Sequence, residues 1–215
     1  MITFYYGSGS PFAWRVWLAL EHKKVPYELR TMSFSAGELR TAEYLRINPR
    51  GRVPAIVDDG FALYESAAIV EYLEEAYPQS GAPLFPGTLL GRALVRRIVE
   101  ETDNYLGRAN ERLVERILFT GKENWNETEI ERARDSFAVE LERFEKMLTA
   151  DWLAGELSAA DHAAYPIIAL ALRIQKRKAE LGIDASIGPR LKAWMSRVEA
   201  LPYYEKTYPP HWKQV

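Results

Sequence analysis

The chain has 215 residues, of which 47% are hydrophobic and 27% charged, with a net charge of −2 and no cysteine. This is the composition of a globular protein with enough apolar side chains for a core, and it gives no electrostatic reason to expect a nucleic acid or an anionic membrane as partner. The absence of cysteine excludes disulfides, thiolate metal sites, a redox dithiol and a cysteine nucleophile.

The three histidines, His22, His162 and His211, are scattered along the chain, so no metal site is expected. No apolar run is long enough to span a membrane, and the first residues lack the basic start of a secretory leader. We therefore expect a cytoplasmic protein.

Strand and helix patterns alternate over residues 1–78. β-branched and aromatic residues at 2–6 predict a strand that stops at Gly7, and Ser10 followed by Pro11 predicts the start of a helix. The expected elements are a strand at 2–6, a helix at 11–24, a strand at 27–32, a helix at 35–47, strands at 53–57 and 61–63, and a helix from residue 65. This order, βαβαββα, implies a mixed four-stranded sheet.

The rest of the chain is expected to be helical. Residues 79–87 are rich in proline and glycine and are assigned as a linker, which leaves 88–215 as an all-helical domain. Within it, Ser158 and Asp161 fit a capping box at the start of a central helix. Apolar residues at helical spacing predict helices over 94–117, 133–148, 164–174 and 191–198.

Ser10 is the first candidate for chemistry. The simple interpretation is a helix N-cap followed by proline. The functional interpretation is that its hydroxyl, at the positive end of the helix dipole, donates a hydrogen bond to a bound thiolate and lowers the pKa of the thiol. Since the chain has no cysteine, that thiol must arrive on a small molecule.

Two further pairs of residues fit a peptide-like ligand. Pro54 inside a strand pattern predicts either an edge position or a cis bond that turns the backbone of Val53 outward to pair with an extended ligand. Glu65 and Ser66 begin a helix, either as a simple cap or as a site where Ser66 and backbone N–H groups bind a carboxylate while Glu65 pairs with an ammonium group.

Four stretches resemble one known family, and the resemblance covers the whole chain in order. They are GSPFAWRVWLAL, NPRGRVPAIVDDG, YES and WLAGELSAADHAAYP. The chain resembles the glutathione transferases, in particular a bacterial-style cytosolic member of the serine type (tau, theta and zeta kinds). The resemblance implies a thioredoxin-like N-terminal domain, an all-helical C-terminal domain, glutathione as co-substrate without a metal, a small electrophile as second substrate, and a homodimer.

The resemblance also implies roles for individual residues. Ser10 would activate the thiol, Val53 would hold the cysteinyl backbone, and Glu65 with Ser66 would bind the γ-glutamyl end. Arg52 stands where many members have lysine or glutamine and would hold the glycyl carboxylate, with Arg40 as a weaker basic candidate. The candidates for electrophile binding are Phe12, Tyr105 and Arg108, together with Ala13, Phe34 and the aromatic tail 208–212.

Three alternatives remain. Tyr6 is the other candidate activator, because some classes of the family use a tyrosine at the end of the first strand. A glutathione-dependent isomerase of the zeta kind is disfavoured because Pro11 replaces the second serine of those enzymes. A binding module without activity is disfavoured because no site residue has been lost.

Overall fold

The computed structural model describes residues 1–213 and divides into two compact units. The first unit comprises Met1–Phe85 together with the chain from Leu201 onward, and the second comprises Pro86–Ala200. The boundary between the two units at Phe85 and Pro86 therefore falls within the proline-rich segment 79–87. The chain after Ala200 packs with the first unit, although the sequence pattern placed it in the helical domain.

The first unit has the predicted βαβαββα order around a four-stranded sheet of strand order β2-β1-β3-β4. β1 pairs in parallel with β2 and antiparallel with β3, and β3 pairs antiparallel with β4. The elements are β1 (Ile2–Tyr6), α1 (Pro11–His22), β2 (Tyr27–Thr31), α2 (Ala42–Ile47), β3 (Ala55–Asp58), β4 (Phe61–Tyr64) and α3 (Ser66–Ala76), with α10 (Tyr204–Thr207) added late in the chain.

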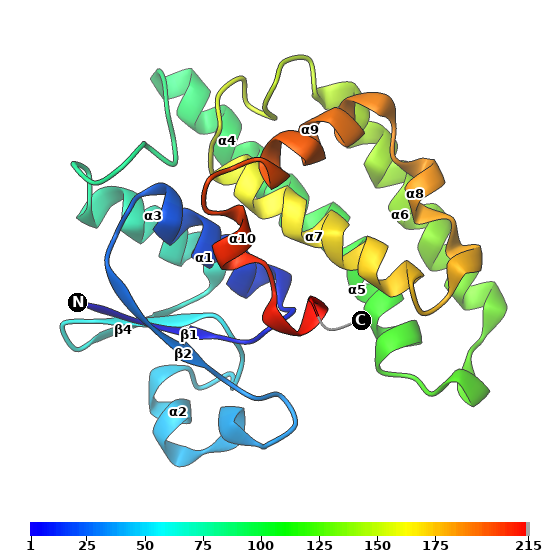
Figure 1. The fold of residues 1–215 in the computed structure, drawn as a ribbon, viewed down its shortest axis with the longest axis horizontal. Coiled ribbons are helices and arrows are strands. Elements are labelled where there is room, and N and C mark those ends of the chain that lie inside the picture. The colour runs from blue at the N-terminus through cyan, green and yellow to red at the C-terminus, as the bar shows by residue number, and fades with distance from the viewer. Residues whose placement is uncertain (214–215) are drawn as a thin grey trace. The chain divides into compact units, whose positions relative to one another are not determined.

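The core of this unit lies between β1 and α1. Ile2, Phe4 and Tyr6 alternate along β1 and are fully buried, as the strand pattern predicts. Every residue of α1 from Ala13 to Leu20 is buried. In Figure 1, α1 and α3 cover one face of the sheet and α2 the other.

The expected helix at 35–47 is wrong in its first half. Only a short 3₁₀ turn, Glu38–Arg40, precedes α2. Thr41 separates the two because its backbone is extended, and its hydroxyl accepts a hydrogen bond from the Tyr44 amide at 3.2 Å. Thr41 is therefore the N-cap of a separate helix.

The second unit contains only helices among its described residues. The long helix expected at 94–117 begins earlier and is interrupted by two π-helical stretches, Thr102–Gly107 and Val114–Leu118. At the first of these the buried Thr102 hydroxyl donates to the Ile98 carbonyl at 2.8 Å, a contact that distorts helices. The α-helices are α4 (Leu89–Glu101), α5 (Arg108–Leu113), α6 (Glu127–Met147), α7 (Ala159–Gln175), α8 (Ile183–Ser186) and α9 (Pro189–Glu199).

No helix of residues 1–213 combines the length and the apolar character needed to cross a membrane. The helix at the centre of the second unit is α7, which contacts α4, α5, α8 and α9. Its residues 164–168 are all buried, as are Leu170, Ala171 and Ile174, which explains why the sequence over 164–174 is apolar on nearly every side.

A buried carboxylate at the start of α7 holds three segments together. The predicted capping box is present, with Asp161 accepting hydrogen bonds from the Ser158 amide at 3.0 Å and the Ser158 hydroxyl at 3.2 Å. Asp161 also accepts from the Leu153 amide at 3.0 Å and from the Trp194 indole on α9 at 2.8 Å. Burial raises the pKa of Asp161 to about 6, although these donors act to lower it.

We expect Asp161→Asn to lower the free energy of unfolding by about 3 kcal/mol at neutral pH, because an amide nitrogen cannot accept from the donors that the carboxylate oxygens serve. Urea denaturation followed by far-ultraviolet circular dichroism measures the loss. The matched control is Asp151→Asn, since the Asp151 side chain is 78% exposed and its replacement should change stability by less than about 0.5 kcal/mol. Equal stabilities for the two variants would contradict the role given to Asp161.

Candidate functional site

The turn Gly7–Ser10 connects β1 to α1 and presents the first candidate residue. The Ser10 amide donates to the Gly7 carbonyl at 3.0 Å, which closes the turn. Gly9 has a φ of +87°, a conformation that favours glycine. Gly7 is needed for space, because a Cβ atom there would lie 2.6 Å from the Phe34 ring and 2.7 Å from the Val53 side chain. The turn thus lies directly beside Val53.

Ser10 is the N-cap of α1, as predicted. Its Oγ accepts a hydrogen bond from the Ala13 amide at 3.3 Å, and Pro11 occupies the first helical position. A serine oxygen that accepts in this way keeps its own O–H as a donor. The half-buried side chain therefore offers a hydrogen-bond donor at the positive end of a helix of 12 residues.

The Val53–Pro54 peptide bond is cis, one of the two predicted possibilities. β3 begins only at Ala55, so Val53 and Pro54 precede the ladder. The hydrogen bonds of the described residues include none from the Val53 amide or to its carbonyl. These two backbone groups therefore have the capacity to pair with an extended ligand.

The loop before Val53 is fixed by side chains of α2 and its C-cap. The Tyr44 hydroxyl and the Asn48 side-chain amide both donate to the Arg52 carbonyl, at 2.6 and 2.7 Å. The Asn48 side-chain oxygen accepts from the Arg50 amide at 3.0 Å. Asn48, which the sequence pattern identified only as part of a helix breaker, thus sets the backbone path up to the cis bond.

Ser66 begins α3 and is paired with a buried cation. An Arg15 guanidinium nitrogen on α1 donates to the Ser66 hydroxyl at 3.3 Å. Arg15 is 1% exposed and Ser66 is 7% exposed. The helix that starts at Ser10 therefore also places a positive charge directly behind Ser66.

Glu65 precedes Ser66 with an unusual backbone, φ +71° and ψ 112°. Its side chain is 69% exposed, and its nearest cation is Arg50, with Nε 3.9 Å from Oε1. A pair this exposed contributes little to stability. The Glu65 carboxylate therefore remains accessible to a ligand.

Tyr6, the alternative activator, points into the core. It is fully buried, and its ring packs edge-on against Trp17 with centroids 4.7 Å apart. Its hydroxyl lies near the Ser8 side chain and the Gly9 backbone, and among the described residues it makes no hydrogen bond of ordinary geometry. Burial raises the pKa of Tyr6, although the nearby Ser8 hydroxyl and Gly9 backbone act to lower it.

The remaining candidates lie on both units. In the first, Arg52 is exposed, the guanidinium of Arg40 lies against Gly51, and the Phe12 ring lies 5.5 Å from the Arg15 guanidinium. In the second, Tyr105 lies in a π-helical stretch and Arg108 begins α5, both exposed. Binding of an electrophile by any of these residues stays a prediction.

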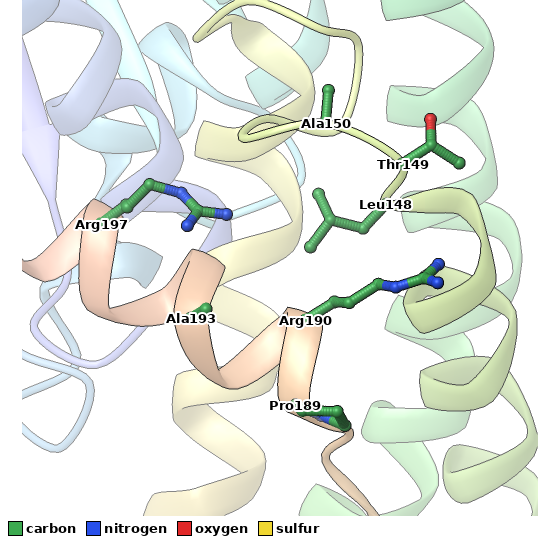
Figure 2. A pocket seen from close by; sticks show the side chains of 7 residues that line it. All are labelled: Leu148, Thr149, Ala150, Pro189, Arg190, Ala193 and Arg197. Atoms are coloured by element: carbon green, nitrogen blue, oxygen red, sulfur yellow. The ribbon is translucent and has the colours of Figure 1, made fainter.

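A cavity of about 510 Å³ lies in the second unit, between the end of α6 and one face of α9 (Figure 2). Its two charged side chains are arginines, of which Arg197 donates from Nε to the Asp151 carbonyl at 3.0 Å. None of the predicted site residues lines it. The lining residues are Leu148, Thr149, Ala150, Pro189, Arg190, Ala193 and Arg197.

Arg15 is the functional candidate that the sequence reasoning did not single out. The sequence does indicate that Arg15 is unusual, because an arginine inside the apolar run WRVWLAL needs hydrogen-bond partners if the helix is buried. Its partner is not visible from the sequence, since Ser66 is 51 residues away.

Comparison with known proteins gives consistent matches over both units. Residues 9–76 match the family described as Glutathione S-transferase, N-terminal domain, and residues 114–202 match Glutathione S-transferase, C-terminal domain. The chain is 34% identical to a glutathione S-transferase from the Antarctic clam Laternula elliptica, with 100% of this chain and 94% of that chain covered and a TM-score of 0.84.

Two further similarities bear on the ligand and the reaction. A glutathione transferase family member from Pseudomonas fluorescens, crystallised with two glutathione bound, is 25% identical, with 97% of this chain and 92% of that chain covered and a TM-score of 0.85. A protein described as probable maleylacetoacetate isomerase 2 from Drosophila melanogaster is 45% identical over 93 residues, which are 42% of this chain and 40% of that protein.

We expect Asn48→Ala to loosen the loop that leads to Val53, because the substitution removes one donor to the Arg52 carbonyl and the acceptor for the Arg50 amide. Hydrogen exchange followed by mass spectrometry should show exchange at 49–53 about tenfold faster, as the loss of one to two hydrogen bonds predicts. Asn104→Ala, which removes a single exposed contact with Glu100, is the control and should leave this loop unchanged. Unchanged exchange in the Asn48 variant would mean that Tyr44 alone fixes the loop.

Proposed function

This chain belongs to the glutathione S-transferase family of enzymes, and we propose that it conjugates the thiolate of glutathione to small apolar electrophiles with the Ser10 hydroxyl as thiol activator. The observation that carries the proposal is the geometry of Ser10. Its Oγ already accepts from the Ala13 amide at 3.3 Å, so its own O–H at the start of α1 remains available as a donor for an anion.

The proposed mechanism is electrostatic. The bound thiol loses its proton to solvent, and the Ser10 O–H and the dipole of α1 stabilise the resulting thiolate. The sulfur then attacks the electrophilic carbon, a C–S bond forms, and the leaving group departs with its electron pair. The protein forms no covalent bond during the reaction.

The remaining parts of glutathione are assigned to residues of the first unit. We assign the cysteinyl backbone to the N–H and C=O of Val53, which lies beside the turn that carries Ser10. The γ-glutamyl carboxylate is assigned to Ser66, where the buried Arg15 adds positive charge, and its ammonium group to Glu65. Arg52 is assigned to the glycyl carboxylate.

The electrophile is assigned to exposed side chains, three of them aromatic and one an arginine. Phe12 and Phe34 in the first unit are 38% and 58% exposed. Tyr105 and Arg108 are the candidates in the second unit. Aromatic faces bind flat apolar substrates, which supports small aromatic electrophiles as the substrate class.

The second candidate function is glutathione-dependent isomerisation. It is favoured by the local similarity to a protein described as a probable maleylacetoacetate isomerase, 45% identical over 93 residues. It is disfavoured by Pro11, which stands where the zeta kind has a second serine. Isomerisation would use the same bound thiolate, which adds to the substrate and later leaves again.

We also propose that the enzyme is a cytoplasmic homodimer. Leu89 and Leu90 at the start of α4 are 72% and 80% exposed, and such an apolar surface is typical of a protein interface.

Retention on immobilised glutathione and conjugation of a generic aryl halide test the proposed function. We expect both, with conjugation that depends on glutathione and rises with pH as the thiolate forms. Retention without conjugation or isomerisation would identify a binding module, and neither retention nor conjugation would overturn the proposal.

Ser10→Ala tests the activator. The pKa of the bound thiol should rise by about 1 to 2 units, the equivalent of one lost hydrogen bond to a charged group. Titration of the ultraviolet thiolate absorbance of the glutathione complex measures this shift. Ser35→Ala, an exposed serine of the same unit, is the control. An unchanged titration for Ser10→Ala together with a raised pKa for Tyr6→Phe would assign activation to Tyr6.

A further inference from the structure

The segment 201–213 packs against α1 through an aromatic cluster around Trp14. The Trp14 indole donates to the Thr207 hydroxyl at 3.1 Å, and both residues are buried. The rings of Tyr204, Tyr208 and Trp212 surround the same indole, with centroids 6.1, 5.8 and 5.6 Å away. Figure 1 shows this part of the chain, in red, beside α1. The segment is therefore fixed to the helix that Ser10 begins.

The anchored segment places one histidine on the turn before Ser10. His211 Nδ1 lies 2.6 Å from the Ser8 hydroxyl oxygen, a hydrogen-bond distance. The same ring covers Gly9, because a Cβ atom at Gly9 would lie only 2.7 Å from His211 Cε1. His211 thus contacts both central residues of the turn.

The two ends of the turn are held by β1 and α1, and its middle residues, Ser8 and Gly9, depend on fewer contacts. Its ends are joined by the hydrogen bond from the Ser10 amide to the Gly7 carbonyl, and its third residue, Gly9, has great conformational freedom. Ser10 is also the N-cap of α1, where its carbonyl accepts from the Trp14 amide at 2.9 Å. A rotation at Ser8 or Gly9 would therefore act on the Ser10 hydroxyl through the hydrogen bond between the Ser10 amide and the Gly7 carbonyl. The His211 ring restricts both positions.

We propose that His211 is a positioning residue for the thiol-activating hydroxyl of Ser10, which it holds in place through Ser8 and Gly9. The inference rests on the proposed function of Ser10 and extends it to a residue 203 positions away from Ser8 in the sequence. A donor that is already oriented when the thiolate forms stabilises it without further reorganisation. Loss of the ring should therefore weaken activation without removing the binding groups for glutathione.

Two substitutions of His211 separate this role from simple packing. His211→Ala removes the contact with Ser8, and the pKa of the bound thiol should rise while kcat at neutral pH falls roughly three- to tenfold, as for the loss of one hydrogen bond. The KM for glutathione should change less than about twofold. His211→Asn keeps a polar atom near the position of Nδ1, and it should restore most of the lost kcat.

Ser8→Ala removes the same contact from the other side with minimal loss of packing, and it should reproduce the effect of His211→Ala. The double variant should be no worse than either single variant, because both remove one interaction. Tyr203→Phe is the matched control. It removes the hydrogen bond between the Tyr203 hydroxyl and His22 Nδ1, 3.0 Å apart, from the same segment but leaves the turn untouched.

The outcomes distinguish this inference from the function on which it rests. An unchanged thiol pKa and kcat in His211→Ala, with a raised pKa in Ser10→Ala, would overturn the role of His211 alone. An unchanged pKa in Ser10→Ala would overturn both. Equal losses in His211→Ala and Tyr203→Phe would show that the segment acts only through packing, which also contradicts the proposal.

Discussion

The hydrogen bond from the Ser10 amide to the Gly7 carbonyl is the constraint on which the proposed site depends. It closes the turn that leads from β1, one of the two central strands of the sheet, into a helix that is buried along most of its length. Because β1 and α1 are both held in the core, the turn between them has a fixed start and a fixed end. Val53 lies against that turn, and Arg15 continues from it along α1 to Ser66. Ser10 thus lies on the segment 7–15, and Val53 and Ser66 both contact that segment.

The features that the sequence predicts are those with a local cause. The buried alternation of β1, the Ser10-Pro11 helix start and the Ser158–Asp161 capping box each depend on residues within a few positions of one another. The break before α2 also has a local cause, the N-cap Thr41. The sequence nevertheless predicts one helix over 35–47, because apolar residues at helical spacing lie on both sides of Thr41. The contacts of Arg15 and His211 could not be predicted, since their partners Ser66 and Ser8 are 51 and 203 residues away in the sequence.

Each unit contains a buried polar group that joins several segments. Arg15 links α1 to the start of α3, and Asp161 links the start of α7 to α9 and to the segment before α7. Buried charges are costly unless hydrogen bonds satisfy them, and they tolerate few alternative arrangements. The two groups therefore determine how the segments around them are placed, in addition to their effect on stability. In the first unit that geometry includes the proposed binding site for the γ-glutamyl end of glutathione.

The return of the chain to the first unit after Ala200 makes that unit discontinuous. Its sheet and first three helices are made early, yet the residues that surround Trp14 follow only after the whole helical unit. During synthesis from the N-terminus, more than half of the chain must therefore be made after Trp14 before Thr207 and Trp212 can pack against it. The helical unit, by contrast, is one continuous stretch, and its last residue is synthesised before the last segment of the first unit. Translation thus supplies the parts of the proposed thiol site at two widely separated times, and completes that site last.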